Sequence, residues 1–139
     1  MSRYDRRREY ISGFSGSSGD AIVTLSKAAL WVDSRYYLQA DDQLNCDWLL
    51  MRVGQTKVPT QSEWLKSQFP SKSRLGADPK LVSASQWEML EDELRNSTIE
   101  LVEVSANLID VIWDNHEEEY VDKNAFVLED KYTGDARSR

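Results

Sequence analysis

Short apolar runs alternate along this chain with segments that carry helix caps, and this alternation most constrains the fold. The runs are rich in Val, Ile, Leu and Trp, as β-strands are. The segments between them place apolar residues on one face, as amphipathic helices do. The expected strands lie at 21–25, 28–32, 48–53, 74–77 and 99–104, and the expected helices at 5–11, 35–44, 60–69, 83–94 and 108–113. Strands that alternate with helices predict an α/β fold.

Local signals mark where several of these elements begin or turn. The spacer Ser26-Lys27 between the first two strands predicts an antiparallel hairpin. Thr60 and Glu63 have the spacing of a capping box, in which each side chain satisfies a backbone N–H at the start of a helix. Ser83 or Ser85 can cap the helix expected at 83–94.

The segment Gly13–Gly19 interleaves glycines with serines and therefore breaks the first helix. Glycine-rich loops can bind phosphate, but a P-loop ends in Gly-Lys-Ser/Thr and opens a helix. This segment lacks that ending and precedes the strand at 21–25. The sequence therefore favours a structural turn.

Charge and composition exclude several classes of partner. The formal net charge is -7, and the only basic cluster, Arg6–Arg8, is flanked by Asp5 and Glu9. Nucleic-acid binding needs clustered cations, so we expect this cluster to be a solvated helix face and no nucleic acid to bind. No apolar run approaches the ~18 residues of a membrane span, and the first residues do not form the apolar core of a signal peptide. With a single cysteine, the expected location is the cytoplasm.

The residues for catalysis are scarce in this sequence. His116 is the only histidine, and it stands beside a glutamate run, which favours a solvated turn over a metal ligand. Cys46 is the only cysteine and is expected to be a half-buried thiol. No Gly-x-Ser-x-Gly elbow is present. The chain by itself is therefore not expected to be an enzyme, and an acyl-transfer or thiol enzyme around Cys46 or a serine of the 13–19 loop is the weakest alternative.

Five tryptophans are many for a domain of this size. Trp31 and Trp87 lie in apolar patterns that predict core positions. For Trp48, Trp64 and Trp113, the sequence leaves core and interface equally open, because interfaces are enriched in tryptophan.

Arg35 is the candidate binding residue. It lies where the strand at 28–32 passes into a helix that Asp33 or Ser34 can cap, and binding side chains are often placed at such element ends. The residues alone favour a structural role, in which Arg35 pairs with Asp33 or caps a carbonyl group. Its planar guanidinium can instead bind a carboxylate through two hydrogen bonds.

Several segments in register resemble the amino-terminal domain of the eukaryotic cytosolic Xaa-Pro aminopeptidases, which belong to the creatinase/aminopeptidase P group of metallopeptidases. The resemblance covers nearly the whole chain. It is carried by the segments 10–19, 31–40, 48–51, 59–65, 76–79, 107–113 and 132–134. The family usually has Gly at the position of Ser34 and often Phe at the position of Tyr37.

The resemblance implies a parent enzyme that removes the first residue from peptides with proline second. Such enzymes use two divalent metals, usually manganese, held by two Asp, one His and two Glu in a carboxy-terminal domain. This chain would be the non-catalytic amino-terminal domain, which shapes the substrate cleft and supports a homodimer. By the same resemblance, Arg35 would reach the cleft and help to hold the proline-containing peptide.

The resemblance also implies a mixed β-sheet flanked by helices that lacks its first strand, since the family domain has a strand and a helix more before this point. Residues 1–128 would form this domain and 129–139 a linker toward a following domain. The alternative is a self-standing binding module or a catalytically dead paralogue with the same fold.

Overall fold

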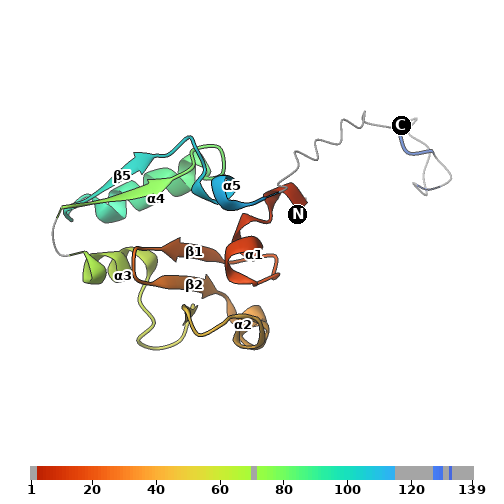
Figure 1. The fold of residues 1–139 in the computed structure, drawn as a ribbon, viewed down its shortest axis with the longest axis horizontal. Helices are drawn as coiled ribbons and strands as arrows, with labels where there is room; N and C mark the ends of the chain where they lie inside the picture. Colours follow the sequence, from red (N-terminus) through yellow and green to blue (C-terminus); the bar gives the residue numbers. More distant parts are fainter. Residues whose placement is uncertain (1–2, 70–71, 115–126, 130–131, 133–139) are drawn as a thin grey trace, which may run out of the picture.

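The computed structural model describes residues 3–69, 72–114, 127–129 and 132. Within them, strands and helices alternate as the sequence predicts (Figure 1). The elements are, in order, η1 (Arg3–Asp5), α1 (Arg7–Ser12), β1 (Asp20–Val23), β2 (Ala28–Val32), η2 (Ser34–Tyr36), α2 (Tyr37–Gln43), β3 (Trp48–Arg52), α3 (Gln61–Gln68), β4 (Ser73–Ala77), α4 (Ala84–Leu94), β5 (Ile99–Glu103) and α5 (Leu108–Ile112). His116 and most of the expected linker at 129–139 lie outside the described residues. In the described part of the chain, no helix is both long and apolar enough to cross a membrane.

The strands form a mixed arrangement, and they divide into two sheets. In the first sheet β2 is central, antiparallel to β1 and parallel to β3. In the second sheet β4 and β5 run parallel. The mixed sheet with flanking helices is thus confirmed. The division into two sheets was not predicted, because an apolar run indicates an extended segment and does not say which neighbour it pairs with.

The central strand β2 is buried on both faces. Successive side chains of a strand point to opposite faces. Ala29 and Trp31 accordingly pack in one core, and Leu30 and Val32 pack in the other. This position explains why the sequence of β2 is continuously apolar instead of alternating.

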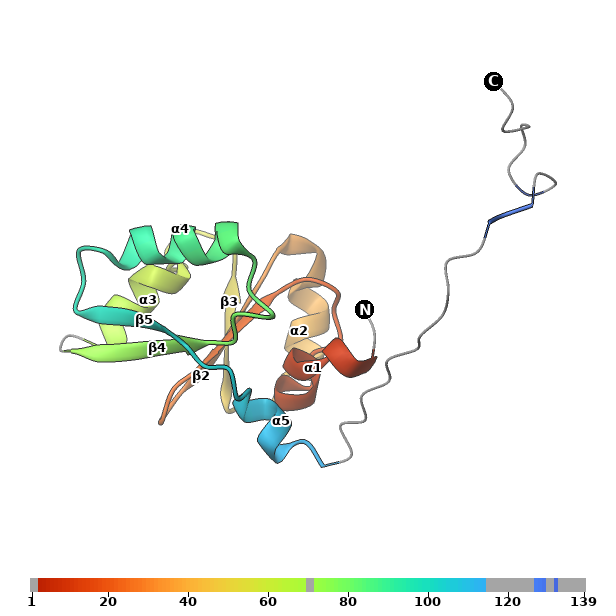
Figure 2. The same cartoon turned by 90° about the horizontal axis from the view of Figure 1, so that it is seen from above.

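The first core joins the two sheets through a pair of helices. Trp64 and Leu65 of α3 and Leu94 of α4 pack with β2 and with Ile99 of β5. Figure 2 shows α3 and α4 on the same side of β4 and β5. The second core lies on the opposite face of β2, where Ala40 of α2 packs with Leu30, Val32 and Phe14.

The predicted helix caps are present. Thr60 and Glu63 form the capping box of α3. Of the two candidate serines, Ser83 caps α4, and Gln86 completes a second capping box. Asp33 caps the short helix η2 through the N–H of Arg35, and α2 begins only at Tyr37, later than expected.

The turn of the β1–β2 hairpin is longer than the predicted Ser26-Lys27 pair. The N–H of Thr24 donates to the Lys27 carbonyl over 2.8 Å, and the Lys27 N–H donates to the Thr24 hydroxyl over 2.9 Å. The threonine side chain therefore closes this turn in place of the Asn-Gly pair that tight hairpins favour.

The expected solvated face at Arg6–Arg8 is wrong for two of its arginines. Arg6 is exposed and pairs with Glu9. Arg7 is buried, and its Nε and Nη2 donate to the two carboxylate oxygens of Asp110 in α5 over 2.7 and 2.9 Å. This bidentate pair raises the pKa of the Arg7 guanidinium, against the opposing effect of burial. Beside it, Tyr10 of α1 stacks on Trp113 at 4.6 Å between ring centroids.

Arg8 and Phe14 fix the loop between α1 and β1. Phe14 is fully buried, and the Arg8 guanidinium lies 5.3 Å from its ring centroid. Arg8 donates to the backbone carbonyls of Gly16 and Gly19. The loop begins at Gly13, whose φ of 75° ends α1 in the left-handed conformation that glycine tolerates. These contacts agree with the predicted structural turn.

We expect Gly16→Ala to destabilise the fold by about 1–3 kcal/mol, as overpacking of a core does. A Cβ at this position would lie 2.2 Å from Cζ of Phe14, and this ring is fully buried. Urea denaturation of the single variant, of Phe14→Leu and of the double variant measures the effect. The smaller leucine should reduce the cost of Gly16→Ala. Equal costs in both backgrounds would show that the ring is not the obstacle.

The tryptophans only partly follow the sequence interpretation. Trp31 is buried, as predicted, and Trp64 is also a core residue, so an interface role for Trp64 is wrong. The two rings meet edge to face with centroids 5.5 Å apart. Trp87 is only half-buried and does not belong to either core cluster. Trp48 and Trp113 are half-buried, packed on the second core and on Tyr10.

Candidate functional site

The turn that follows β2 presents Arg35 to solvent. Its side chain is 67% exposed. Arg35 Nε donates to Oδ1 of Asp33 and Nη2 to Oδ2, both over 2.8 Å. The backbone N–H of Arg35 also donates to Oδ1 over 3.1 Å. The pairing with Asp33 that the residues favoured is therefore present, and it uses only one edge of the guanidinium.

The opposite charges of Arg35 and Asp33 balance each other within the pair. Hydrogen bonding from the Arg35 side chain lowers the pKa of Asp33 to about 2. Desolvation opposes this shift, and the Arg35 backbone N–H and the Ser18 hydroxyl add to it. The same hydrogen bond to Asp33 raises the pKa of Arg35. Both groups are therefore charged at neutral pH, and their charges cancel.

The loop Gly13–Gly19 contacts this turn and supports it. The sequence did not predict this contact. Ser17 and Tyr36 are joined through their hydroxyls over 2.6 Å. The Tyr36 ring lies edge-on to buried Phe14, and the Arg35 guanidinium lies 5.0 Å from the Tyr36 centroid. The only signal in the sequence is the clustering of serines before β1, which does not indicate where their hydroxyls point.

Arg35 keeps hydrogen-bonding capacity for another molecule. A guanidinium has five N–H donors and cannot accept or release a proton near neutral pH. Nε and one N–H of Nη2 are used by Asp33, so the Nη1 end is available. The arrangement can hold an oxygen acceptor in place, and it cannot act as an acid, a base or a nucleophile.

The described part of the chain does not assemble the other candidate chemistry. Cys46 is exposed, so the expected half-buried thiol is wrong. In the loop, Ser15 bonds to Gln43, and Ser17 to Tyr36 as described above. The only imidazole of the chain, that of His116, lies outside the described residues. Across residues 3–69, 72–114, 127–129 and 132, no three His, Cys, Asp or Glu side chains come together as metal ligands, so these residues do not fit a two-metal centre.

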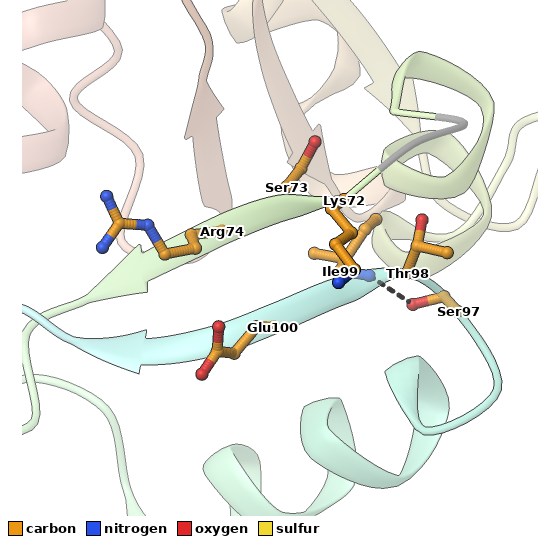
Figure 3. A pocket seen from close by; sticks show the side chains of 7 residues that line it. All are labelled: Lys72, Ser73, Arg74, Ser97, Thr98, Ile99 and Glu100. Carbon is orange, nitrogen blue, oxygen red and sulfur yellow. Dashed lines mark hydrogen bonds between the residues drawn. The ribbon is translucent and has the colours of Figure 1, made fainter.

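An open pocket of about 740 Å³ lies elsewhere, at the start of β4 and β5. Arg74 and Glu100 are register neighbours in the two strands, and Figure 3 shows their side chains pointing in different directions. The lining residues are Lys72, Ser73, Arg74, Ser97, Thr98, Ile99 and Glu100. This pocket does not include Arg35, so the structure does not bring the two features into one site.

Comparison with known proteins supplies a family for this fold. Residues 3–112 match the Creatinase/Prolidase N-terminal domain. The chain is 38% identical to human Xaa-Pro aminopeptidase 2 over 135 residues, which is 96% of the chain and 20% of that protein. It is 45% identical to Aminopeptidase P2 of Arabidopsis thaliana over 129 residues, or 92% of the chain and 18% of that protein. The chain thus spans about a fifth of the length of these curated relatives.

Solved structures agree with the sequence matches. The X-prolyl aminopeptidase of Caenorhabditis elegans, a cytosolic enzyme with a di-nuclear active site, superposes with a TM-score of 0.82 at 32% identity. This superposition covers 96% of the chain and 22% of that protein. The N-terminal domain of the cytoplasmic peptidase PepQ from Mycobacterium tuberculosis shares the fold, with a TM-score of 0.60 at 24% identity over 78% of the chain and 81% of that structure. The chain therefore belongs to the Creatinase/Prolidase N-terminal domain family.

Proposed function

We propose that this chain is the non-catalytic N-terminal domain of an Xaa-Pro aminopeptidase, an enzyme that removes the first residue from peptides with proline second. The observation that carries the proposal is the similarity to Xaa-Pro aminopeptidases over 96% of the chain. Two divalent metals, manganese by the family resemblance, would be held by another domain of the complete enzyme.

The domain's part in the reaction is to wall one side of the substrate cleft. Arg35 carries this role, because it is exposed in η2, just after β2, and has N–H donors that Asp33 does not use. A guanidinium can donate to peptide carbonyl oxygens, and its planar fork matches carboxylates, which can accept two parallel bonds. The same proposal includes assembly of the complete enzyme as a homodimer in the cytoplasm.

The assay uses an Xaa-Pro peptide and manganese, with the 139-residue chain and the complete reading frame measured side by side. We expect turnover by the complete protein and none by the chain alone. Turnover by the purified chain would contradict a non-catalytic domain. An inactive complete protein that folds would favour a catalytically dead paralogue.

In the complete enzyme, we expect Arg35→Ala to lower kcat/KM by about tenfold or more, the usual effect of losing a hydrogen bond to a charged group. The fold should be unaffected, because the side chain is exposed. Steady-state kinetics measure the effect, and circular dichroism checks the fold. Arg52→Ala is the matched control, since Arg52 also pairs with an aspartate, Asp41, on the surface. An unchanged kcat/KM for Arg35→Ala would remove its substrate role.

A further inference from the structure

We infer that the outer face of α5 is the docking surface for the domain that follows this one in the complete protein. That face consists of Leu108, Val111 and Ile112, which are 72%, 74% and 59% exposed. The inference goes beyond the role of Arg35. It rests only on the part of the proposed function that makes this chain one domain of a longer protein.

Helix α5 is apolar on two sides. Leu108, Val111 and Ile112 have the spacing that places side chains together on one side of a helix. Ile109 and Trp113 lie on the other side and are half-buried. A helix face that meets water is normally polar, and a helix that is apolar all round is normally buried. The composition of α5 is therefore that of a helix covered on both sides, although its outer face is exposed in the structure.

The inner side of α5 is anchored to the rest of the domain. Arg7 of α1 binds Asp110 through two hydrogen bonds, and the Tyr10 hydroxyl donates to the Ile112 carbonyl over 2.8 Å. Asn107 caps the first turn. Figure 2 shows α5 beside α1 at the edge of the molecule. A helix of five residues is too short to be stable alone, so these contacts hold its outer face in one orientation. A partner therefore does not have to order this face when it binds.

The position of α5 in the chain selects the partner. The match to the family ends at residue 112, which is the last residue of α5. That family is an N-terminal domain, and the chain spans about a fifth of the length of its curated relatives. In a protein of that length a further domain follows α5. A short flexible tether gives such a domain an effective concentration of roughly millimolar, which favours it over a second copy of the chain.

The size of the face fits the same partner. A stable complex of separate chains buries about 1,600 Å² in total, of which one short helix supplies only a fraction. Interfaces between domains of one chain begin at about 600 Å². Tyr10 is 43% exposed and stacks on Trp113, so it extends the face with the aromatic area that interfaces favour. A tethered domain is therefore the partner that this face suits best.

The test compares hydrogen exchange in the 139-residue chain and in the complete protein. The measured quantity is the exchange rate of the backbone amides of α5, which exchange when the helix opens. We expect this rate to be lower by about tenfold or more in the complete protein, because the apolar face must leave its partner before the helix can open. Equal rates in the two proteins would overturn the inference.

Val111→Asp places a charge in the middle of the face. In the complete protein it should return the exchange of α5 to near the rate of the 139-residue chain, because burying an unpaired charge is costly. In the 139-residue chain it should change the rate by no more than about twofold, since the side chain is exposed. Met89→Asp is the matched control, because Met89 is 63% exposed on another helix, α4. It should leave the exchange of α5 unchanged in both proteins.

Val111→Thr replaces this variant where the aspartate unfolds the 139-residue chain. Threonine keeps the shape of valine and adds a hydroxyl group that an apolar interface does not satisfy. Its effect should be smaller and should still appear only in the complete protein. An effect of equal size in both proteins would show that Val111 stabilises α5 itself, and the inference would be wrong.

Other occupants of the face give different results. With a second copy, the protection of α5 in the 139-residue chain would rise with concentration, and light scattering would show a dimer that Val111→Asp dissociates. With the remainder of this chain, α5 would exchange as slowly in the 139-residue chain as in the complete protein. Either result overturns the inference.

Turnover of an Xaa-Pro peptide by the complete protein is scored separately. An active protein in which α5 exchanges as fast as in the 139-residue chain removes the inference and leaves the proposed function standing. A folded but inactive protein in which α5 is protected, and loses protection in Val111→Asp, removes the proposed activity and supports the inference.

Discussion

Replacing Phe14 with alanine is expected to lower the free energy of unfolding by about 3–5 kcal/mol, the usual cost of deleting a buried aromatic ring. Phe14 is fully buried and joins Leu30 and Val32 of β2 and Ala40 of α2 in the second core. Its ring also supports Tyr36 and lies under Arg8. The cavity left by alanine would be lined by side chains of β2 and α2, which the backbone of these elements holds in place.

Equilibrium denaturation in urea measures this change, with the slope checked to confirm a two-state transition. Leu25→Ala is the control, because Leu25 lies fully exposed in the hairpin turn. We expect it to change stability by no more than about 0.5 kcal/mol. A loss below about 1 kcal/mol for Phe14→Ala would contradict the packing described for the loop.

Arg7→Ala should be the second severe change, lowering stability by about 3 kcal/mol. Removing one partner of a buried ion pair costs about 3–5 kcal/mol because the other charge is left behind. The side chain of Arg7 is 7% exposed and that of Asp110 is 33% exposed, so we expect the lower end of this range. Arg7 also donates to the Tyr4 carbonyl over 3.3 Å, a bond that alanine cannot replace.

Thermal and chemical denaturation measure this loss, and hydrogen exchange locates it at α1 and α5. The control is Arg95→Ala, whose partner Asp92 lies one helical turn away, with side chains 71% and 65% exposed. Such exposed pairs contribute about 0–1 kcal/mol. Similar losses for the two variants would show that burial of Arg7 does not matter.

The sequence predicted those elements whose signals are local. The capping box of α3 and the Ser83 cap of α4 depend on residues three positions apart, so the chain fixes them by itself. The continuously apolar β2 likewise indicated a strand. The predictions that failed concern residues whose partners lie far away in the sequence. The charge run at Arg6–Arg8 does not indicate that Asp110, far along the chain, binds Arg7.

The candidate site shows the same division. The neighbouring Asp33 indicated a pairing partner for Arg35, and the structure has this pair. The support from Ser17 and Tyr36 was not visible, because it requires the loop to fold back onto the turn. Trp64 was left open between core and interface because composition alone does not distinguish them.

The pairing of Arg7 with Asp110 also sets an order of events during synthesis. The two residues are 103 positions apart, so α1 leaves the ribosome long before its partner exists. At translation rates of about 5–20 residues per second, Asp110 is synthesised roughly 5–20 seconds after Arg7. During that interval the first helix is too short to be stable alone, and it is open to chaperones and proteases. Helix α1 is therefore made early in the synthesis of this domain, but it is stabilised only after α5 has been made.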